Sequence, residues 1–307
     1  MRNALYNIDG TGIAWYTSAQ NDFFPGVDGM RSSLYKTTTP PLADMNFKSI
    51  CINTSTTALF AHIRASSGSP VVTTNNHPFV FGRHTFMHNG SVSSFSNIRR
   101  AICDEIDLDC YANVFGGTDS EHIAALYTHY LTLGNGKDSW QLEYPVREMA
   151  AALHKAVAFV IKAQMDILGD KRRPNSLNLA ATDGRRLLTY RFRNHKVEQP
   201  PSLYYSTTAG VTLNRKYEGH PNADVGGTFG VPETQTRMAE EHGKHVIVAS
   251  EPTTYIEEEW ELLPKNSCLM MDVDGKVVVE DVAYDESWDA EDVTAYETKE
   301  HQACTIL

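Results

Sequence analysis

The sequence predicts an α+β fold in which two β-sheets lie between layers of helices. Strand-like segments come first along the chain, helix-like segments occupy the middle, and strand-like segments return after Pro174. This order is expected when sheets pack on each other between helical layers. No break in composition divides the 307 residues. We therefore expect one domain over residues 1–282 and a flexible, acidic C-terminal tail over residues 283–307.

The first predicted strands lie in the N-terminal third of the chain. Gly12 to Thr17 is short and aromatic, and Thr57 to Arg64 is mostly apolar, which is typical of interior strands. Phe79 to Phe81 and Thr85 to His88 flank the turn residue Gly82, which predicts a hairpin. The second strand of that hairpin would carry Asn89-Gly90 at its end, where chemistry is often found.

Three helices are predicted in the middle of the chain. Isoleucines at every fourth position predict the first, from Ser94 to about Ile106, with serine side chains capping its start. The second begins at Thr118 or Asp119 and ends at Gly134, and the third runs from about Pro145 to Leu168.

The last part of the chain returns to strands. Residues 177–182 and 187–192 flank Asp183-Gly184, which is a strong hairpin signal. Further strands are predicted at 203–207, 245–250, 268–272 and 277–282, and the glycine-rich stretch 212–242 is expected to be loop.

Composition excludes several classes of protein. A formal net charge of −11 would repel a phosphate backbone, so we expect no nucleic-acid partner. The five cysteines are irregularly spaced without a CxxC pair, which favours a reducing, cytoplasmic location. No apolar run of membrane-spanning length occurs. The terminus Cys304 to Leu307 has the outline of a prenylation box, although the acidic residues before it also fit a frayed tail.

Three sequence blocks point to a family. They are AHIRASSG at 61–68, NHPF at 76–79 with MHNG at 87–90, and GTDSE at 117–121. In this order they resemble the substrate-holding motifs of the class II glutamine amidotransferases, which are N-terminal nucleophile hydrolases. Residues 9–16 (DGTGIAWY) and 249–252 (ASEP) are similar to two further family segments. The resemblance implies a four-layer αββα sandwich.

Within the family, one branch is the most similar. Residues 177–186 (LNLAATDGRR) resemble the branch that contains the fungal glutathione-degradation subunit and the bacterial ergothioneine-pathway γ-glutamyl amidohydrolase. The resemblance implies hydrolysis of a γ-glutamyl amide to release glutamate. We expect no cofactor. The resemblance also implies a metallopeptidase-like partner subunit.

The motif residues supply the groups that a γ-glutamyl substrate requires. Its α-carboxylate suits the guanidinium fork of Arg64, with the Ser67 hydroxyl as an auxiliary donor. The resemblance makes Asp119 the partner of the α-ammonium, and the Asn89 side chain and Gly90 backbone N–H the oxyanion hole.

Each residue also has a structural interpretation. Arg64 fits a surface-paired strand residue, Asn89-Gly90 a hairpin turn, and Asp119 a helix N-cap. Their joint occurrence favours the functional interpretation. The histidines lack the HxH or HExxH spacing of a metal site, so we expect them to be structural; they are His62, His77, His84 and His88.

The family nucleophile is a cysteine that follows the initiator methionine, and here position 2 is Arg2. Only eight residues precede Asp9, so the resemblance implies that the first strand of the fold is missing and that this sequence does not hydrolyse amides. Two explanations stay open: an incomplete form of an active enzyme, or a noncatalytic γ-glutamyl-binding or scaffold subunit. The first is favoured because losing an interior strand would expose backbone groups and an apolar edge.

Overall fold

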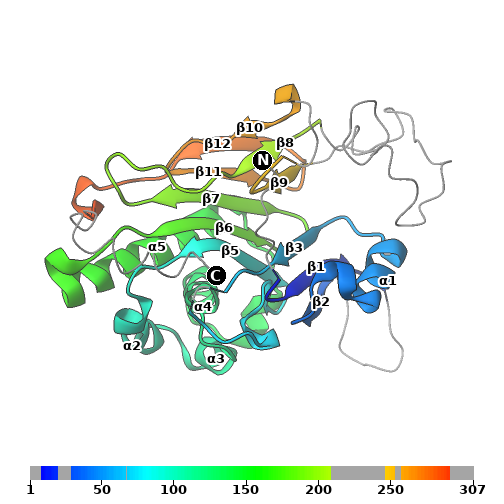
Figure 1. The fold of residues 1–307 in the computed structure, drawn as a ribbon, viewed down its shortest axis with the longest axis horizontal. Helices are drawn as coiled ribbons and strands as arrows, with labels where there is room; N and C mark the ends of the chain where they lie inside the picture. Colours follow the sequence, from blue (N-terminus) through cyan, green and yellow to red (C-terminus); the bar gives the residue numbers. More distant parts are fainter. Residues whose placement is uncertain (1–7, 20–28, 67, 209–245, 253–256, 291–307) are drawn as a thin grey trace.

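The fold is α+β, as the sequence predicts (Figure 1). The computed structural model describes residues 8–19, 29–66, 68–208, 246–252 and 257–290. The predicted loop at 212–242 and residues 291–307, which include Cys304, lie outside these ranges. None of the helices within them offers the length of apolar side chains needed to cross a lipid bilayer.

A six-stranded antiparallel sheet is the centre of the fold, with strand order β12-β11-β7-β6-β5-β4. All six strands were predicted, with ends shifted by a few residues. The bounds are β4 (Phe79–Phe81), β5 (His84–Ser91), β6 (Ser176–Thr182), β7 (Leu187–Arg193), β11 (Ser267–Met271) and β12 (Val277–Asp281).

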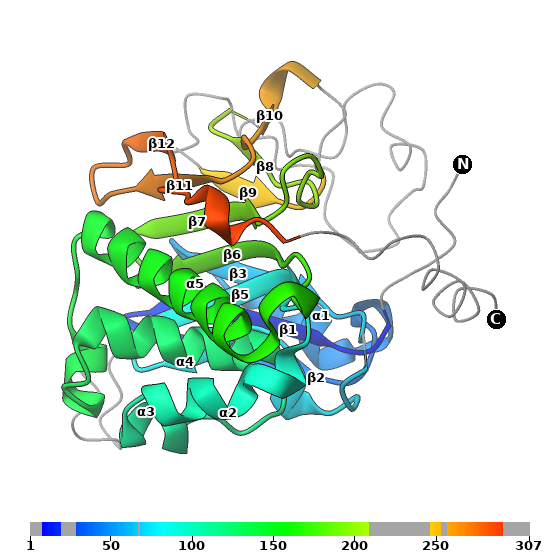
Figure 2. The same ribbon diagram turned by 90° about the vertical axis from the view of Figure 1, so that its left-hand side faces the viewer.

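Helices cover one face of this sheet (Figure 2). They are α2 (Phe95–Glu105), α3 (Leu108–Ala112), α4 (Asp119–Thr132) and α5 (Val146–Leu168). The main core lies between these helices and the sheet, because apolar faces such as Ile98 and Ile102 of α2 and Met149 and Leu153 of α5 are removed from water there. The periodicity that predicted α2, α4 and α5 therefore reflects the buried face.

The start of α2 differs from the prediction. Ser94 does precede the helix, but its φ of 53° is left-handed and its side chain makes no capping hydrogen bond. The backbone N–H of the neighbouring Ser93 instead donates to Oδ1 of Asn175, the residue directly before β6, at 2.9 Å. Tertiary contacts, and not a serine cap, position this end of α2.

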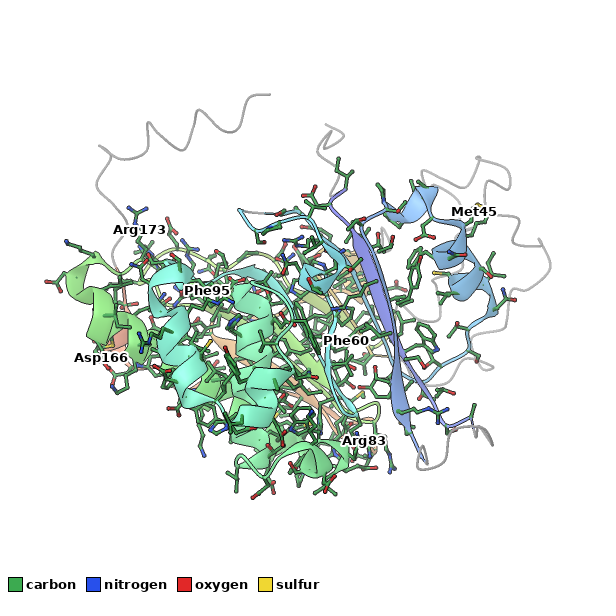
Figure 3. All side chains as sticks on the ribbon, turned by 90° about the horizontal axis from the view of Figure 1, so that it is seen from below. Met45, Phe60, Arg83, Phe95, Asp166 and Arg173 are labelled. Carbon is green, nitrogen blue, oxygen red and sulfur yellow. The ribbon has the colours of Figure 1, made fainter. Side chains whose placement is uncertain are left out.

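Two three-stranded sheets lie on the other face of the six-stranded sheet. One has the order β2-β1-β3 and the other β10-β8-β9. Figure 3 places Phe95 of α2 on one side, Met45 of α1 on the opposite side, and Phe60 of β3 between them. The bounds are β1 (Thr11–Thr17), β2 (Arg31–Thr37), β3 (Leu59–Ile63), β8 (Tyr204–Ser206), β9 (Ile247–Ala249), β10 (Glu261–Leu262) and α1 (Met45–Asn53).

Four helices and strands of the described structure were not predicted from the sequence: β2, β10, α1 and α3. Helix α1 has no buried residue, and strand β2 has none either, so neither carries the apolar periodicity by which such elements are recognised. Short 3-10 helices complete the described secondary structure, at Pro41–Ala43, Thr73–Asn75, Lys137–Gln141, Gly169–Lys171, Glu257–Glu259 and Glu286–Trp288.

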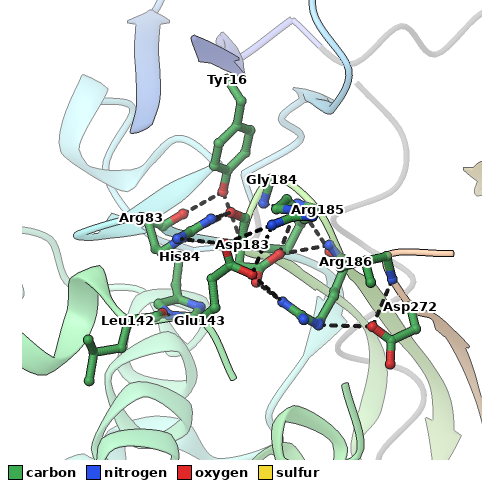
Figure 4. A network of polar contacts seen from close by, with 12 residues as sticks. Tyr16, Arg83, His84, Leu142, Glu143, Asp183, Gly184, Arg185, Arg186 and Asp272 are labelled. Atoms are coloured by element: carbon green, nitrogen blue, oxygen red, sulfur yellow. Dashed lines mark hydrogen bonds and ion pairs between the residues drawn. The ribbon is translucent and has the colours of Figure 1, made fainter. Parts of the chain in front are cut away.

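A buried polar network joins β1 to the six-stranded sheet (Figure 4). The Tyr16 hydroxyl lies 2.6 Å from the Arg83 carbonyl oxygen and 3.0 Å from the Thr182 carbonyl oxygen. The Arg83 guanidinium donates to the Asp183 carbonyl oxygen, and the buried Asp183 carboxylate accepts from Arg186 at 3.0 Å. These contacts bring together the turns β4–β5 and β6–β7.

The beginning of the predicted acidic tail packs on the molecule as far as it is described. Tyr284 and Trp288 lie against the main core and Ala290 is buried. The Asn194 side chain donates to the Trp288 carbonyl oxygen at 3.0 Å. Residues 283–290 are therefore held by both apolar and polar contacts.

Candidate active site

A polar pocket of about 110 Å³ lies where the ends of β3 and β5 meet the start of α4. Four of the five predicted site residues line it: Arg64, Asn89, Gly90 and Asp119. The fifth, Ser67, lies outside the described residues. The wall also contains eight residues that the prediction did not include: His62, Ile63, Ala65, Ser69, His77, His88, Thr118 and Ser120.

Arg64 follows directly after β3 and is almost fully buried, at 4% exposure. Burial lowers the pKa of its guanidinium, although Asp9 opposes that effect. One terminal nitrogen donates to the Pro70 carbonyl oxygen at 3.1 Å, and the other to the Ser69 hydroxyl at 2.5 Å. Arg64 is thus a buried cation held by neutral oxygens, and a carboxylate could replace the hydroxyl.

Asp119 is the first residue of α4, where the helix dipole favours a negative charge. The Thr118 side chain caps this helix by accepting from the Glu121 N–H at 3.2 Å. Its Oδ2 accepts from the Val92 backbone N–H at 2.7 Å, and its Oδ1 from the Ser120 backbone N–H at 2.8 Å. Oδ2 therefore has a lone pair left for a ligand cation, whereas Oδ1 also lies 3.3 Å from the Ser120 hydroxyl. The carboxylate is fixed by the loop after β5 as well as by its own helix.

Asn89 and Gly90 are exposed to the pocket near the end of β5. They are not a hairpin turn, because the strand continues to Ser91 and pairs with β6 through Asn89↔Asn178 and Gly90↔Leu177. Gly90 has a φ of 141°, and a Cβ there would lie 1.9 Å from the Ser176 carbonyl oxygen. Glycine is required at this position by the close approach of the β6 backbone.

Three histidines in the pocket wall were predicted to be structural. The ring Nδ1 atoms of His62 and His77 lie 3.3 Å apart, and His88 bridges β6 and α4. Burial lowers the pKa of His62 to about 4 and that of His77 well below its usual range, so both rings are neutral at pH 7. His62 could have been recognised from its i, i+2 spacing to Arg64, which places both on one strand face.

The pocket contains no cysteine among its described lining residues. Cys51 is exposed on α1, while Cys110 and Cys268 are buried among apolar side chains that raise the pKa of their thiols. Within the described ranges, no cluster of His, Cys, Asp or Glu has the arrangement of a metal site. The pocket therefore contains charged and polar groups but no described thiol that could act as a nucleophile.

A larger pocket of about 340 Å³ lies between β3 and the β6–β7 turn. It contains two arginines, Arg185 and Arg186, but both form ion pairs with Glu143, and Arg186 also with Asp183. Their charges are already compensated, so the smaller pocket is the stronger candidate for recognising a charged ligand.

Comparison with known proteins finds a relative among the glutamine amidotransferases. No model of a known protein family matches the chain. The Probable glutamine amidotransferase DUG3 of Saccharomyces cerevisiae is 29% identical over 271 residues, which are 87% of this chain and 70% of the yeast protein. The chain is thus a homologue of this yeast glutamine amidotransferase.

Solved structures of class II glutamine amidotransferases have the same fold as this chain. A glutamine aminotransferase class-II domain protein from Silicibacter pomeroyi matches with a TM-score of 0.57 at 21% identity, covering 90% of this chain and 92% of that one. The glutamine phosphoribosylpyrophosphate amidotransferase of Bacillus subtilis matches with a TM-score of 0.51 at 9% identity, covering 91% of this chain and 44% of that one. The α+β arrangement is thus that of class II glutamine amidotransferases.

Proposed function

We propose that this pocket binds the γ-glutamyl group of a small amide or peptide, in the manner of a γ-glutamyl amide hydrolase that acts in glutathione or γ-glutamyl-thiol degradation and releases glutamate. The observation that carries the proposal is the meeting of a buried cation, Arg64, and a fixed anion, Asp119, in one small pocket. An α-amino acid carries the complementary pair of charges, a carboxylate and an ammonium. Location in the cytoplasm and a metallopeptidase-like partner remain part of this proposal.

Each polar group of the pocket would bind a different part of the substrate. The carboxylate would take the place of the Ser69 hydroxyl on the Arg64 guanidinium, which gains a charge-assisted pair of hydrogen bonds. The ammonium would use the free lone pairs of Asp119. The Asn89 amide and the Gly90 N–H would then receive the γ-carbonyl oxygen as it gains charge, where one donor is worth about 3–4 kcal/mol in the transition state.

A second candidate is a noncatalytic γ-glutamyl-binding or scaffold subunit. The lack of cysteine among the described lining residues of the pocket favours it. Both candidates predict that the chain with this sequence binds a γ-glutamyl compound, and they differ in whether the protein from its natural source turns that compound over.

Binding is tested by calorimetry with L-glutamate on the wild-type protein and on Asp119→Asn. Losing one charge of a buried pair costs about 2–5 kcal/mol, so the variant should bind at least tenfold more weakly. Glu148→Gln is the matched control, because Glu148 is an exposed acid in the first turn of α5, outside the pocket. Equal affinity of all three proteins would refute the proposed site.

Catalysis is tested by glutamate release from glutathione, glutamine and γ-glutamylcysteine. We expect release from the protein purified from its natural source. Source protein that binds L-glutamate but releases none, with its co-purified partners present, would favour the scaffold.

A further inference from the structure

His88 connects the two halves of the candidate site. It immediately precedes Asn89 in β5, is 2% exposed, and lines the pocket. Its Nε2 lies 3.2 Å from the Ser176 carbonyl oxygen, and its Nδ1 lies 3.0 Å from the Ser120 hydroxyl. The ring therefore spans from the strand next to the oxyanion-hole residues to the first turn of α4.

These contacts determine which ring nitrogen of His88 carries the hydrogen in the singly protonated imidazole. A carbonyl oxygen only accepts hydrogen bonds, so Nε2 carries the proton and donates to Ser176. Nδ1 then has a bare lone pair that needs a donor. Ser120 is 5% exposed, and its hydroxyl is the donor that the structure places there.

The Ser120 hydroxyl also lies 3.3 Å from Asp119 Oδ1. It has one proton, which cannot be donated to His88 and to Asp119 together. The contact with His88 is the shorter of the two, at 3.0 Å. While His88 accepts this proton, Asp119 Oδ1 keeps only the Ser120 backbone N–H as a protein donor.

We propose that His88 is a positioning residue for substrate recognition: by accepting the Ser120 hydroxyl proton, it leaves the Asp119 carboxylate free to bind the α-ammonium of a γ-glutamyl ligand. This inference rests on the proposed function. It assigns to His88 a role in selecting ligands that carry an α-ammonium, in addition to holding β5 against β6 and α4.

The alternative is a purely structural role, in which His88 only ties three elements together. The two roles differ in their effect on ligand selectivity. Loss of a positioning residue should weaken L-glutamate, which has the ammonium, and leave glutarate, which lacks it, almost unchanged. Loss of a structural residue should weaken both ligands by the same factor.

The test measures the ratio of the dissociation constants of glutarate and L-glutamate by calorimetry. In His88→Leu the Ser120 proton turns to Asp119, and the ratio should fall by about tenfold, the effect of one hydrogen bond to a charged group. Ser120→Ala should keep the wild-type ratio, and His88→Leu should have no further effect on the ratio in that background. An unchanged ratio in His88→Leu, or the same fall in both backgrounds, overturns the inference.

Two further measurements keep the test decisive. If His88→Leu does not fold, His88→Gln replaces it. A glutamine amide can donate to the Ser176 carbonyl oxygen and accept from the Ser120 hydroxyl, so this variant should keep most of the wild-type ratio of dissociation constants. A ratio as low as that expected of the leucine variant contradicts the inference. Imidazole nitrogen NMR of the wild-type protein should show the proton of His88 on Nε2, a readout that needs no ligand. A proton on Nδ1 refutes the inference, whereas the absence of L-glutamate binding with the proton on Nε2 refutes only the proposed function.

Discussion

The Tyr16 hydroxyl donates a hydrogen bond of 2.6 Å to the Arg83 carbonyl oxygen, across the boundary between the β1 sheet and the six-stranded sheet. Thr85 Oγ1 lies 2.9 Å from the same hydroxyl. Burial raises the pKa of Tyr16 well above its usual range, so the phenol stays protonated and remains a donor. One side chain thereby connects the two sheets at the end of β5 opposite the candidate site.

Tyr16→Phe should destabilise the protein by about 1–3 kcal/mol, because it leaves the Arg83 carbonyl oxygen without this donor. Urea unfolding followed by circular dichroism measures the change. Tyr111→Phe is the matched control, since Tyr111 is exposed and should change stability by no more than about 0.5 kcal/mol. Equal stability of the two variants would show that the sheets do not depend on this contact.

Gly90→Ala should destabilise the protein much more than Gly275→Ala. Both glycines have positive φ, which costs an alanine roughly 1–2 kcal/mol. A Cβ at Gly275 meets nothing within 4 Å, whereas one at Gly90 would lie 1.9 Å from the Ser176 carbonyl oxygen and force β5 away from β6. The difference in unfolding free energy between the variants measures that overlap, and no difference would contradict the close approach.

Arg64→Lys should weaken L-glutamate binding by about tenfold or more, because an ammonium cannot form the paired hydrogen bonds that a guanidinium forms with a carboxylate. Binding of 4-aminobutyrate, which lacks the α-carboxylate, should change little. The control is Arg147→Lys, which alters an exposed arginine of α5 paired with Glu280. Calorimetry with both ligands distinguishes loss of the carboxylate contact from general damage to the pocket, which would weaken both.

His84 should make the fold less stable as the pH falls from about 6.5 to about 4. Burial lowers the pKa of its imidazole from 6.5 to about 4 in the folded protein, while the unfolded chain keeps the ordinary value. Between these two values the unfolded chain binds a proton that the folded chain does not, so acidification favours unfolding, by up to about 1.4 kcal/mol per pH unit. Above pH 6.5 both forms are neutral and the effect disappears.

His84→Gln should therefore reduce the slope of unfolding free energy against pH in that window. Urea unfolding at pH 7, 6 and 5 measures the slope for both proteins. The variant should keep part of the slope of unfolding free energy against pH, because burial also lowers the pKa of His62 to about 4. Parallel slopes in the two proteins would show that His84 is accessible to protons in the folded state.

The local pattern of the sequence was sufficient to predict the elements that carry the core. Helix α5 shows its apolar face over more than twenty residues, and β6 and β7 flank the Asp183-Gly184 turn, so period and turn chemistry locate them without tertiary information. Helix α1 and strand β2 bury no residue, and their sequences therefore carry no such pattern. The motif order also indicated the family and named Arg64, Asn89, Gly90 and Asp119.

Only the tertiary structure decided how those residues meet and what holds them. The end of β3, the end of β5 and the start of α4 come together because two sheets and a helical layer pack on one another, and this packing depends on contacts between segments far apart in the chain. The hydrogen bond from the Val92 N–H to Asp119 and the contact between His88 and Ser120 form only when these segments pack together. Sequence periodicity reports which side of an element is buried; it does not report which distant side chain it is buried against.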